Sequence, residues 1–207
     1  VSQDFEDSSH GGFNHLTVDS ATGIVYVGAV NRLYQLDADL GKQEEVDTSD
    51  SNGDNGNKVL VIDDQHDQLV TCGSQLDGHC QIRQLDDISQ ATSYDSSTNL
   101  PVAANNPEDS TMAFIGPGPS DVADADFVLY VATTATEGDL RDRIPVVSSR
   151  NMQGSKTMRI SYTDPFISSD GTKILSKTGL DASLSNNKIQ YKVGFSVEGF
   201  SYLLTNQ

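Results

Sequence analysis

The same order of short strands recurs along this chain, and this recurrence limits the folds that the chain can adopt. The clearest copy runs from residue 13 to residue 36. Phe13–Val18 alternates large apolar with polar residues, the period of a half-buried strand, whereas 24–30 is a β-branched and aromatic run typical of a strand buried on both faces. A turn at Asn31-Arg32 precedes 33–36, which alternates again. Residues 13–36 therefore predict three consecutive strands joined by tight turns.

Two further groups follow in the same order, and a fourth begins. We expect their strands at 58–63, 68–73 and 79–85; at 111–116, 127–133 and 144–148, with 156–162 as an outer strand; and at 188–195 and 200–205. Val27, Cys72 and Val131 occupy equivalent positions in the second strand of each group, at spacings of 45 and 59 residues. Several short strands per unit of about 40–50 residues are typical of a β-propeller. The competing all-β fold, a sandwich, would not need the strand order to repeat.

The remaining stretches predict connectors. Residues 1–12 are polar and acidic and predict a loose leader, while 37–57 and 89–109 predict polar loops; 164–177 is ambiguous. Three groups and part of a fourth are fewer than the roughly 4–8 blades of a closed propeller. We therefore expect one incomplete propeller domain over 13–207, with about three blades and the start of a fourth.

The charge of the chain excludes two classes of partner. It has 30 acidic and 13 basic side chains, a formal net charge of −17. Such a chain repels phosphate backbones and anionic lipid headgroups, so we expect neither nucleic acid nor membrane-surface binding. No apolar run approaches the roughly 20 residues that a membrane-spanning helix needs.

Two cysteines, Cys72 and Cys80, flank a loop of seven residues in which Gly73 and Gly78 ease the turn. In an extracellular setting this spacing favours a local disulfide. Two free thiols, or an incomplete metal pair with His79, are the alternatives that the residues themselves leave open.

Nothing in the sequence predicts catalysis or a cofactor. The four histidines, His10, His15, His66 and His79, lie in separate segments, and Gly116–Ser120 lacks the pattern of a nucleophile elbow. The acidic loop 50–56 has Asn55 where an EF-hand needs glycine and Val61 where it needs glutamate. Only a weak calcium site of another type remains open there.

Several ordered motifs resemble one family. They are FNHLTVD and YVGAVNRLYQL in the first group, NKVLVID at 57–63, CGSQLDGHCQIRQL at 72–85 and SSRNM at 148–152. Together they closely resemble the N-terminal part of the semaphorin-like (sema) domain of plexins, the cell-surface receptors for semaphorins. One departure is that 44–57 lacks the cysteine pair that plexins commonly carry in this connector.

The resemblance implies a seven-bladed propeller in which Cys72 and Cys80 form the family's short disulfide loop. It also implies a non-enzymatic, extracellular module on the plasma membrane that binds a semaphorin and acts in axon guidance and cell migration, with a co-receptor or receptor homo-oligomerisation as further partners. The alternatives are a secreted semaphorin-like ligand and an extracellular enzyme built on a propeller.

The resemblance also implies that the ligand contact lies on the third and fourth blades, in the variable run 164–187. Arg150 and Arg159 are either contacts for an acidic partner or ordinary strand residues. The expected partner-binding residues are Leu180, Asp181, Leu184, Ser185, Asn186 and Asn187.

Overall fold

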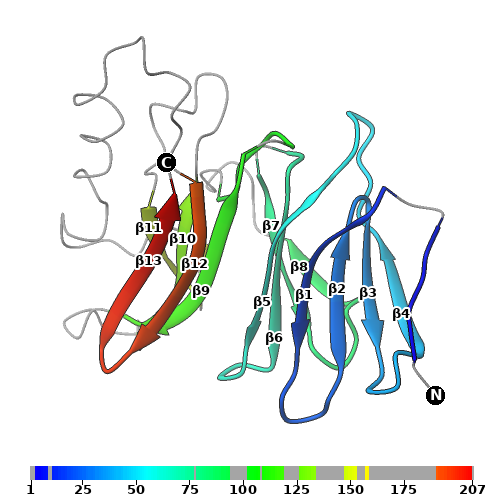
Figure 1. The fold of residues 1–207 in the computed structure, drawn as a ribbon, viewed down its shortest axis with the longest axis horizontal. Coiled ribbons are helices and arrows are strands. Elements are labelled where there is room, and N and C mark those ends of the chain that lie inside the picture. Colours follow the sequence, from blue (N-terminus) through cyan, green and yellow to red (C-terminus); the bar gives the residue numbers. More distant parts are fainter. Residues whose placement is uncertain are drawn as a thin grey trace. The chain divides into compact units, whose positions relative to one another are not determined.

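The computed structural model contains only β-structure in the part of the chain that it describes, as Figure 1 shows. The strands form four antiparallel sheets, divided between two compact units, Val1–Ser93 and Tyr94–Gln207. The described residues are 3–8, 11–76, 78–93, 102–107, 109–118, 126–133, 147–152, 157–158 and 190–206.

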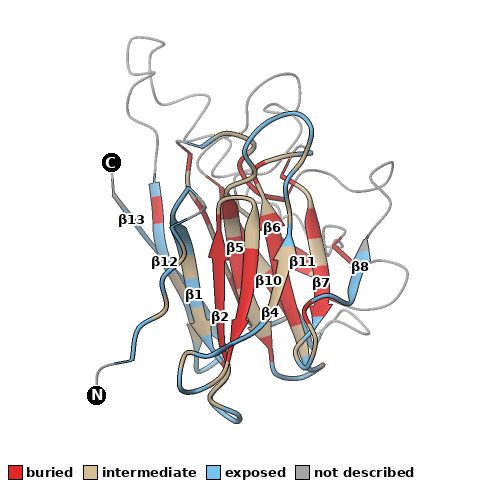
Figure 2. Ribbon diagram, turned by 90° about the vertical axis from the view of Figure 1, so that its right-hand side faces the viewer, coloured by how far each residue is buried: buried red, intermediate tan, exposed pale blue. Residues whose placement is uncertain are grey.

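The first unit opens with the sheet β1-β2-β3-β4. Its strands are β1 (Phe13–Val18), β2 (Val25–Ala29), β3 (Arg32–Leu36) and β4 (Lys42–Asp47). The three strands predicted between 13 and 36 are confirmed, and β2 is buried along its whole length (Figure 2). The prediction that 37–57 is all loop is wrong, because β4 pairs with β3 from Arg32↔Asp47 to Leu36↔Lys42.

The second sheet of this unit repeats the order as β5-β6-β7-β8. Its strands are β5 (Asn57–Asp63), β6 (Gln68–Gly73), β7 (Cys80–Gln84) and β8 (Ala91–Ser93). The first three were predicted, whereas β8 falls in a stretch that we expected to be a connector. Each sheet of the unit therefore has four strands joined in sequence order, which is the pattern of propeller blades and not of a sandwich.

The second unit has a three-stranded sheet and a hairpin. The sheet orders β11-β10-β9, with β9 (Thr111–Pro117), β10 (Phe127–Thr133) and β11 (Val147–Asn151); the hairpin pairs β12 (Gln190–Val197) with β13 (Phe200–Asn206). β12 lies against β9, where Gly194 approaches Phe114 so closely that a Cβ would overlap its ring.

Two predicted segments of the second unit turn out differently. The strand expected at 144–148 is β11, which begins at Val147 within the described residues. Of the outer strand expected at 156–162, only Thr157 and Met158 are described, and they form a turn. The ambiguous stretch 164–177 lies outside the described residues.

The core of the first unit has two parts. One lies between the sheets and joins Tyr26 and Leu33 to residues of the second sheet; its buried members are Tyr26, Leu33, Leu60, Leu69 and Ile88. The other lies on the opposite face of the first sheet and is completed by Phe5, whose ring is 5.0 Å from that of Tyr34. The segment predicted as a loose leader thus contributes an aromatic ring to the core.

β1 is half-buried, as predicted, but the buried side is the polar one. Phe13, Leu16 and Val18 are 50%, 66% and 50% exposed, whereas His15 and Thr17 are half-buried. His15 Nδ1 lies 2.9 Å from Asn57 Oδ1, so a hydrogen bond joins the first strands of the two sheets. Hydrogen bonding across this contact explains why the polar residues of β1 face inward.

Candidate functional site

The residues predicted to bind a partner are not among those that the structure describes. Leu180, Asp181, Leu184, Ser185, Asn186 and Asn187 all fall in the range 159–189, and so does Arg159.

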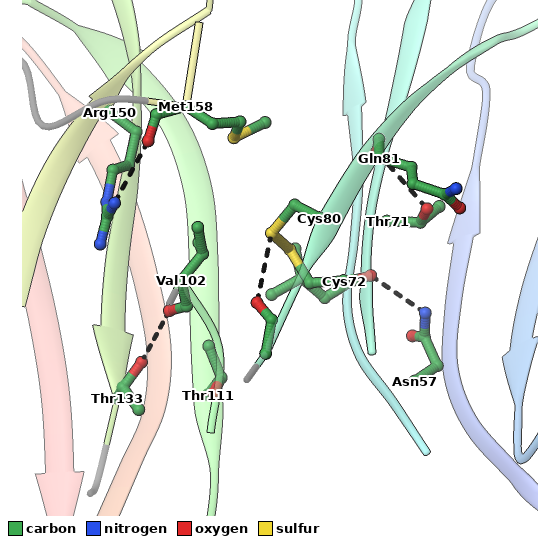
Figure 3. Close-up of a disulfide and its surroundings, with 12 residues drawn as sticks. Asn57, Thr71, Cys72, Cys80, Gln81, Val102, Thr111, Thr133, Arg150 and Met158 are labelled. Carbon is green, nitrogen blue, oxygen red and sulfur yellow. Dashed lines mark hydrogen bonds between the residues drawn. A yellow bond between two sulfur atoms is a disulfide. The ribbon is translucent and has the colours of Figure 1, made fainter. Parts of the chain in front are cut away.

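The disulfide between Cys72 and Cys80 is present, with the sulfur atoms 2.07 Å apart (Figure 3). Cys72 is near the end of β6 and Cys80 begins β7, and the two residues are directly paired in the sheet. Both side chains are buried. The prediction of a local disulfide is confirmed, and the alternatives of free thiols or a metal pair do not apply.

A cavity of about 220 Å³ opens beside this disulfide in the first unit. Its wall comes from the connector that follows β4, the start of β5, the end of β6, the disulfide loop and β7. Leu33, a core residue, lines it from the first sheet, and Arg83 lines it from the second. We call this space, defined by these segments, the disulfide-loop cavity.

Asn55 holds the rim of the cavity together. Its side-chain nitrogen donates to the carbonyl of Thr48 (2.8 Å), and its side-chain oxygen accepts from the backbone N–H of Gln75 (3.0 Å). Its backbone N–H donates to the side-chain oxygen of Asn31 (2.7 Å). One residue thus connects three loops, so the rim is formed before any ligand arrives.

Gly73 also belongs to this rim. A Cβ on Gly73 would overlap the side-chain amide of Asn55, which the bonds to Thr48 and Gln75 keep in place. Only glycine permits this close approach of the β6 backbone to Asn55.

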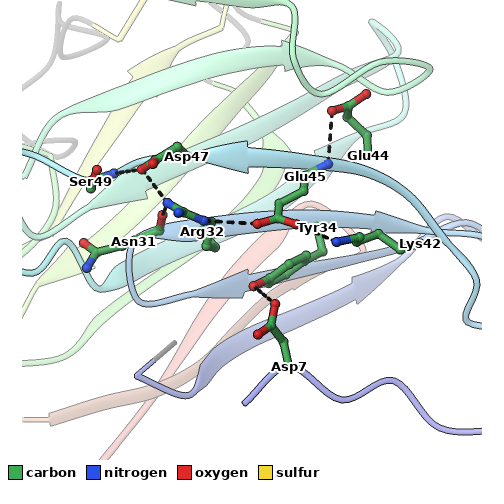
Figure 4. A network of polar contacts seen from close by, with 9 residues as sticks. All are labelled: Asp7, Asn31, Arg32, Tyr34, Lys42, Glu44, Glu45, Asp47 and Ser49. Carbon is green, nitrogen blue, oxygen red and sulfur yellow. Dashed lines mark hydrogen bonds and ion pairs between the residues drawn. The ribbon is translucent and has the colours of Figure 1, made fainter. Parts of the chain in front are cut away.

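A network of ion pairs lies next to the cavity on the first sheet (Figure 4). Arg32 is 3.1 Å from Glu45 and 2.5 Å from Asp47, and Lys42 is 2.6 Å from Glu45. Hydrogen bonds from Ser49, followed by the charge of Arg32, lower the pKa of Asp47. Asp47, which lines the cavity, is therefore an ionised carboxylate that already has partners.

Arg83 is the buried cation of the cavity. The residue is only 3% exposed. Its acceptors are neutral: Thr71 Oγ1 for Nε (3.4 Å), the Ile88 carbonyl for Nη1 (2.7 Å) and Gln81 Oε1 for Nη2 (2.5 Å). Burial lowers the pKa of Arg83, and within the described ranges no carboxylate forms an ion pair with it.

His79 also lines the cavity, whereas His15 and His66 hold structural positions. Burial lowers the pKa of His79, which favours the neutral imidazole near neutral pH. His66 lies 2.6 Å from the buried carboxylate of Asp63 in the turn between β5 and β6, and His15 bonds to Asn57 as described above. His10 is outside the described residues.

Arg150 is a buried strand residue and not a surface contact. It is 1% exposed, and it donates to Ser148 Oγ (3.0 Å) and to the Met158 carbonyl (3.2 Å; Figure 3). Burial lowers its pKa to about 10. Of the two interpretations of Arg150 drawn from the sequence, the one as a strand residue is correct and the one as a contact for a partner is wrong.

Asp50, at the start of the acidic loop 50–56, caps that loop. Its carboxylate accepts from the backbone N–H of Asn52 (2.9 Å) and from the Asn52 side chain (2.6 Å).

Across the ranges that the structure describes, no three or more His, Cys, Asp or Glu residues gather as a metal site. In the same ranges no helix qualifies as a membrane span.

The chain is similar in sequence to several known proteins. No known protein-family profile matches it. Plexin-A4 from mouse and from human are each 31% identical to it over 220 residues, which is 95% of this chain and 11% of each relative. Mouse Plexin-B2 is 38% identical over 138 residues, 57% of this chain and 7% of that protein. The chain thus spans about a tenth of the length of the curated relatives it matches.

Solved structures agree with this placement. The plexin A4 full extracellular region, domains 1 to 8, superimposes with a TM-score of 0.67 at 26% identity, over 94% of this chain and 23% of that one. Drosophila Semaphorin 2a superimposes with a TM-score of 0.57 at 13% identity, over 92% of this chain and 32% of that one, a likeness of fold alone.

The sheets and these likenesses define an all-β partial propeller of the sema type. The chain is a plexin homologue, and the family resemblance read from its motifs is confirmed.

Proposed function

We propose that this chain is the ligand-binding module of a plexin-like semaphorin receptor, placed on the extracellular face of the plasma membrane. The observation that supports the proposal is its likeness to the plexin A4 extracellular region over 94% of the chain. In the structural superpositions, identity to the plexin A4 extracellular region exceeds identity to Drosophila Semaphorin 2a, 26% against 13%, which favours a receptor over a semaphorin-like ligand. In this proposal 13–207 acts as one sema-type domain without catalysis.

The proposed contact is the run 164–187, and its centre is the set of residues predicted from the sequence. Leu184 supplies an apolar side chain and Asn187 an amide, a combination suited to a protein interface. Binding would couple to signalling in axon guidance and cell migration, with a co-receptor or a second receptor copy as additional partners.

The test is binding of the full-length protein to a panel of semaphorin ectodomains, measured by surface plasmon resonance. We expect Leu184→Arg and Asn187→Trp each to weaken binding by about tenfold or more, since central interface residues commonly cost above 1 kcal/mol. Ser51→Arg is the matched control, because it adds a cation to an exposed loop outside 164–187.

Two results would count against this proposal. Absence of binding to every semaphorin of the panel would reject the receptor function. Undiminished binding of both variants would keep that function but remove 180–187 from the contact.

A further inference from the structure

Arg83 is a buried charge that has no countercharge among the residues that the structure describes. Arg83 has five N–H groups, and its three hydrogen bonds to Thr71, Ile88 and Gln81 use three of them. One N–H group on each terminal nitrogen is left over. Buried charges are normally paired, so a buried arginine whose acceptors in the described residues are all neutral needs an explanation.

Part of the explanation is structural. By donating to the Ile88 carbonyl, Arg83 fixes the turn between β7 and β8. Gln35 does the same from β3, where its side-chain nitrogen donates to the Asp86 carbonyl (3.2 Å) and its oxygen accepts from the Ile88 N–H (3.3 Å). A neutral amide thus suffices for this role, so the positive charge of Arg83 is not accounted for by it.

The rest of the explanation lies in the cavity that Arg83 lines. His79 also lines it, and no hydrogen bond from its ring is found in the described part of the chain. Two residues whose side chains carry N–H donors, Arg83 and His79, therefore line the cavity. Because Asn55 fixes the rim, a ligand would not have to order these loops on binding.

Size and charge select the ligand. The volume of about 220 Å³ is below the roughly 300–1,000 Å³ of small-molecule pockets and suits a single side chain. A guanidinium with a free N–H on each terminal nitrogen matches a carboxylate. The rim carries Asp47 and Asp50, which oppose a doubly charged phosphate more than a singly charged carboxylate and attract basic residues beside it.

We propose that the disulfide-loop cavity binds one acidic side chain of a protein partner, with Arg83 pairing the carboxylate and flanking basic residues of the partner meeting Asp47 and Asp50. None of the residues that line the cavity belongs to the run 164–187, so the proposal does not depend on semaphorin binding at that run.

The test is a titration of the full 207-residue chain with two capped peptides, acetyl-Lys-Glu-Lys-amide and acetyl-Lys-Gln-Lys-amide, followed by nuclear magnetic resonance. We expect the Glu peptide to bind about tenfold more tightly than the Gln peptide and to shift the Arg83 Nε–H and His79 ring signals. Arg83→Gln should abolish that preference, while Lys42→Gln, which removes an exposed cation outside the cavity, should keep it.

A second variant covers the case in which Arg83→Gln disturbs the fold. Ser49 is exposed at the cavity wall, so Ser49→Trp should block entry while Arg83 keeps its bonds, and should also abolish the preference. Equal affinity for the two peptides, or a preference that survives in both variants, would overturn the proposal. Binding of sodium acetate at the same signals without binding of the Glu peptide would overturn the protein source and assign the site to a free carboxylate.

Discussion

At the scale of single residues, buried polar side chains recur at the third strand of successive sheets. Gln35 on β3, Arg83 on β7 and Arg150 on β11 are each at most 3% exposed. Each donates to a backbone carbonyl outside the strands. Arg83 and Arg150 bond to Ile88 and Met158 in the segments that follow their own strands, whereas Gln35 bonds to Asp86 in the turn after β7 of the next sheet. Paired in this way, a polar side chain can fix a connector that has no core of its own.

Gly73 offers a direct test of the rim. Because the Asn55 amide is held by Thr48 and Gln75, it cannot move away from a new Cβ without losing hydrogen bonds. We expect Gly73→Ala to lower the free energy of unfolding by about 1–3 kcal/mol in chemical denaturation. Gly56→Ala is the control: its Cβ would meet only Ser74 Oγ at 3.8 Å, so a similar loss there would contradict the explanation.

His15 gives the fold a dependence on pH. Burial lowers its pKa below the ordinary 6.5, more than the hydrogen bond to Asn57 raises it. The unfolded chain therefore binds the proton first as pH falls, and stability declines below about pH 6.5. His79 shifts in the same direction.

We therefore expect a lower melting temperature at pH 5.5 than at pH 7.5, with a smaller difference in His15→Gln. Calorimetric melts at the two pH values measure both quantities. The same pH difference in the variant and in the natural chain would exclude His15 as its source.

At the scale of elements, the strands that were predicted are those whose own residues specify them. β2 and β6 carry β-branched and apolar residues that favour a buried strand wherever they occur. β4, with the sequence KQEEVD, has no such preference. It is a strand because it pairs with β3 and because Arg32 binds Glu45 and Asp47. These contacts cannot be predicted from the local sequence pattern of β4.

The candidate site was harder to predict than the strands, for the same reason. The disulfide can be predicted from the spacing of two cysteines within one loop. The cavity, by contrast, is lined by residues from several segments scattered between positions 33 and 83 of the sequence. One signal was available: in CQIRQ an arginine stands in a strand whose cysteine and isoleucine are core residues. A charge at such a position usually has a partner or a function.

The disulfide makes a prediction about the hairpin of β6 and β7. Closing a loop of this length contributes about 2–3 kcal/mol in the chain-entropy treatment. We expect Cys72→Ala combined with Cys80→Ala to reduce the free energy of unfolding by that amount. Chemical denaturation with and without dithiothreitol provides its own control, because reductant should lower the stability of the natural chain and leave the double variant unchanged.

At the scale of the whole molecule, net charge and exposed apolar surface act in opposite directions. The charge of −17 makes copies of the chain repel each other, and salt weakens that repulsion. One face of the hairpin in the second unit is apolar and exposed, because residues paired across the two strands share a face. Its members are Val193, Phe195, Val197, Phe200, Tyr202 and Leu204, each 43–66% exposed.

This balance predicts salt-dependent self-association. Near about 0.02 M NaCl, where charges act over roughly 20 Å or more, we expect the 207-residue chain to sediment as a monomer; near about 0.5 M, where screening leaves a few ångströms, the apolar face should drive association. Phe200→Ser with Tyr202→Ser keeps the charge and should suppress it. Leu76→Ser, which removes a 63% exposed apolar side chain on the disulfide loop, should not. Association that is equal in both variants would mean that another surface is responsible, because neither substitution changes the charge that salt screens.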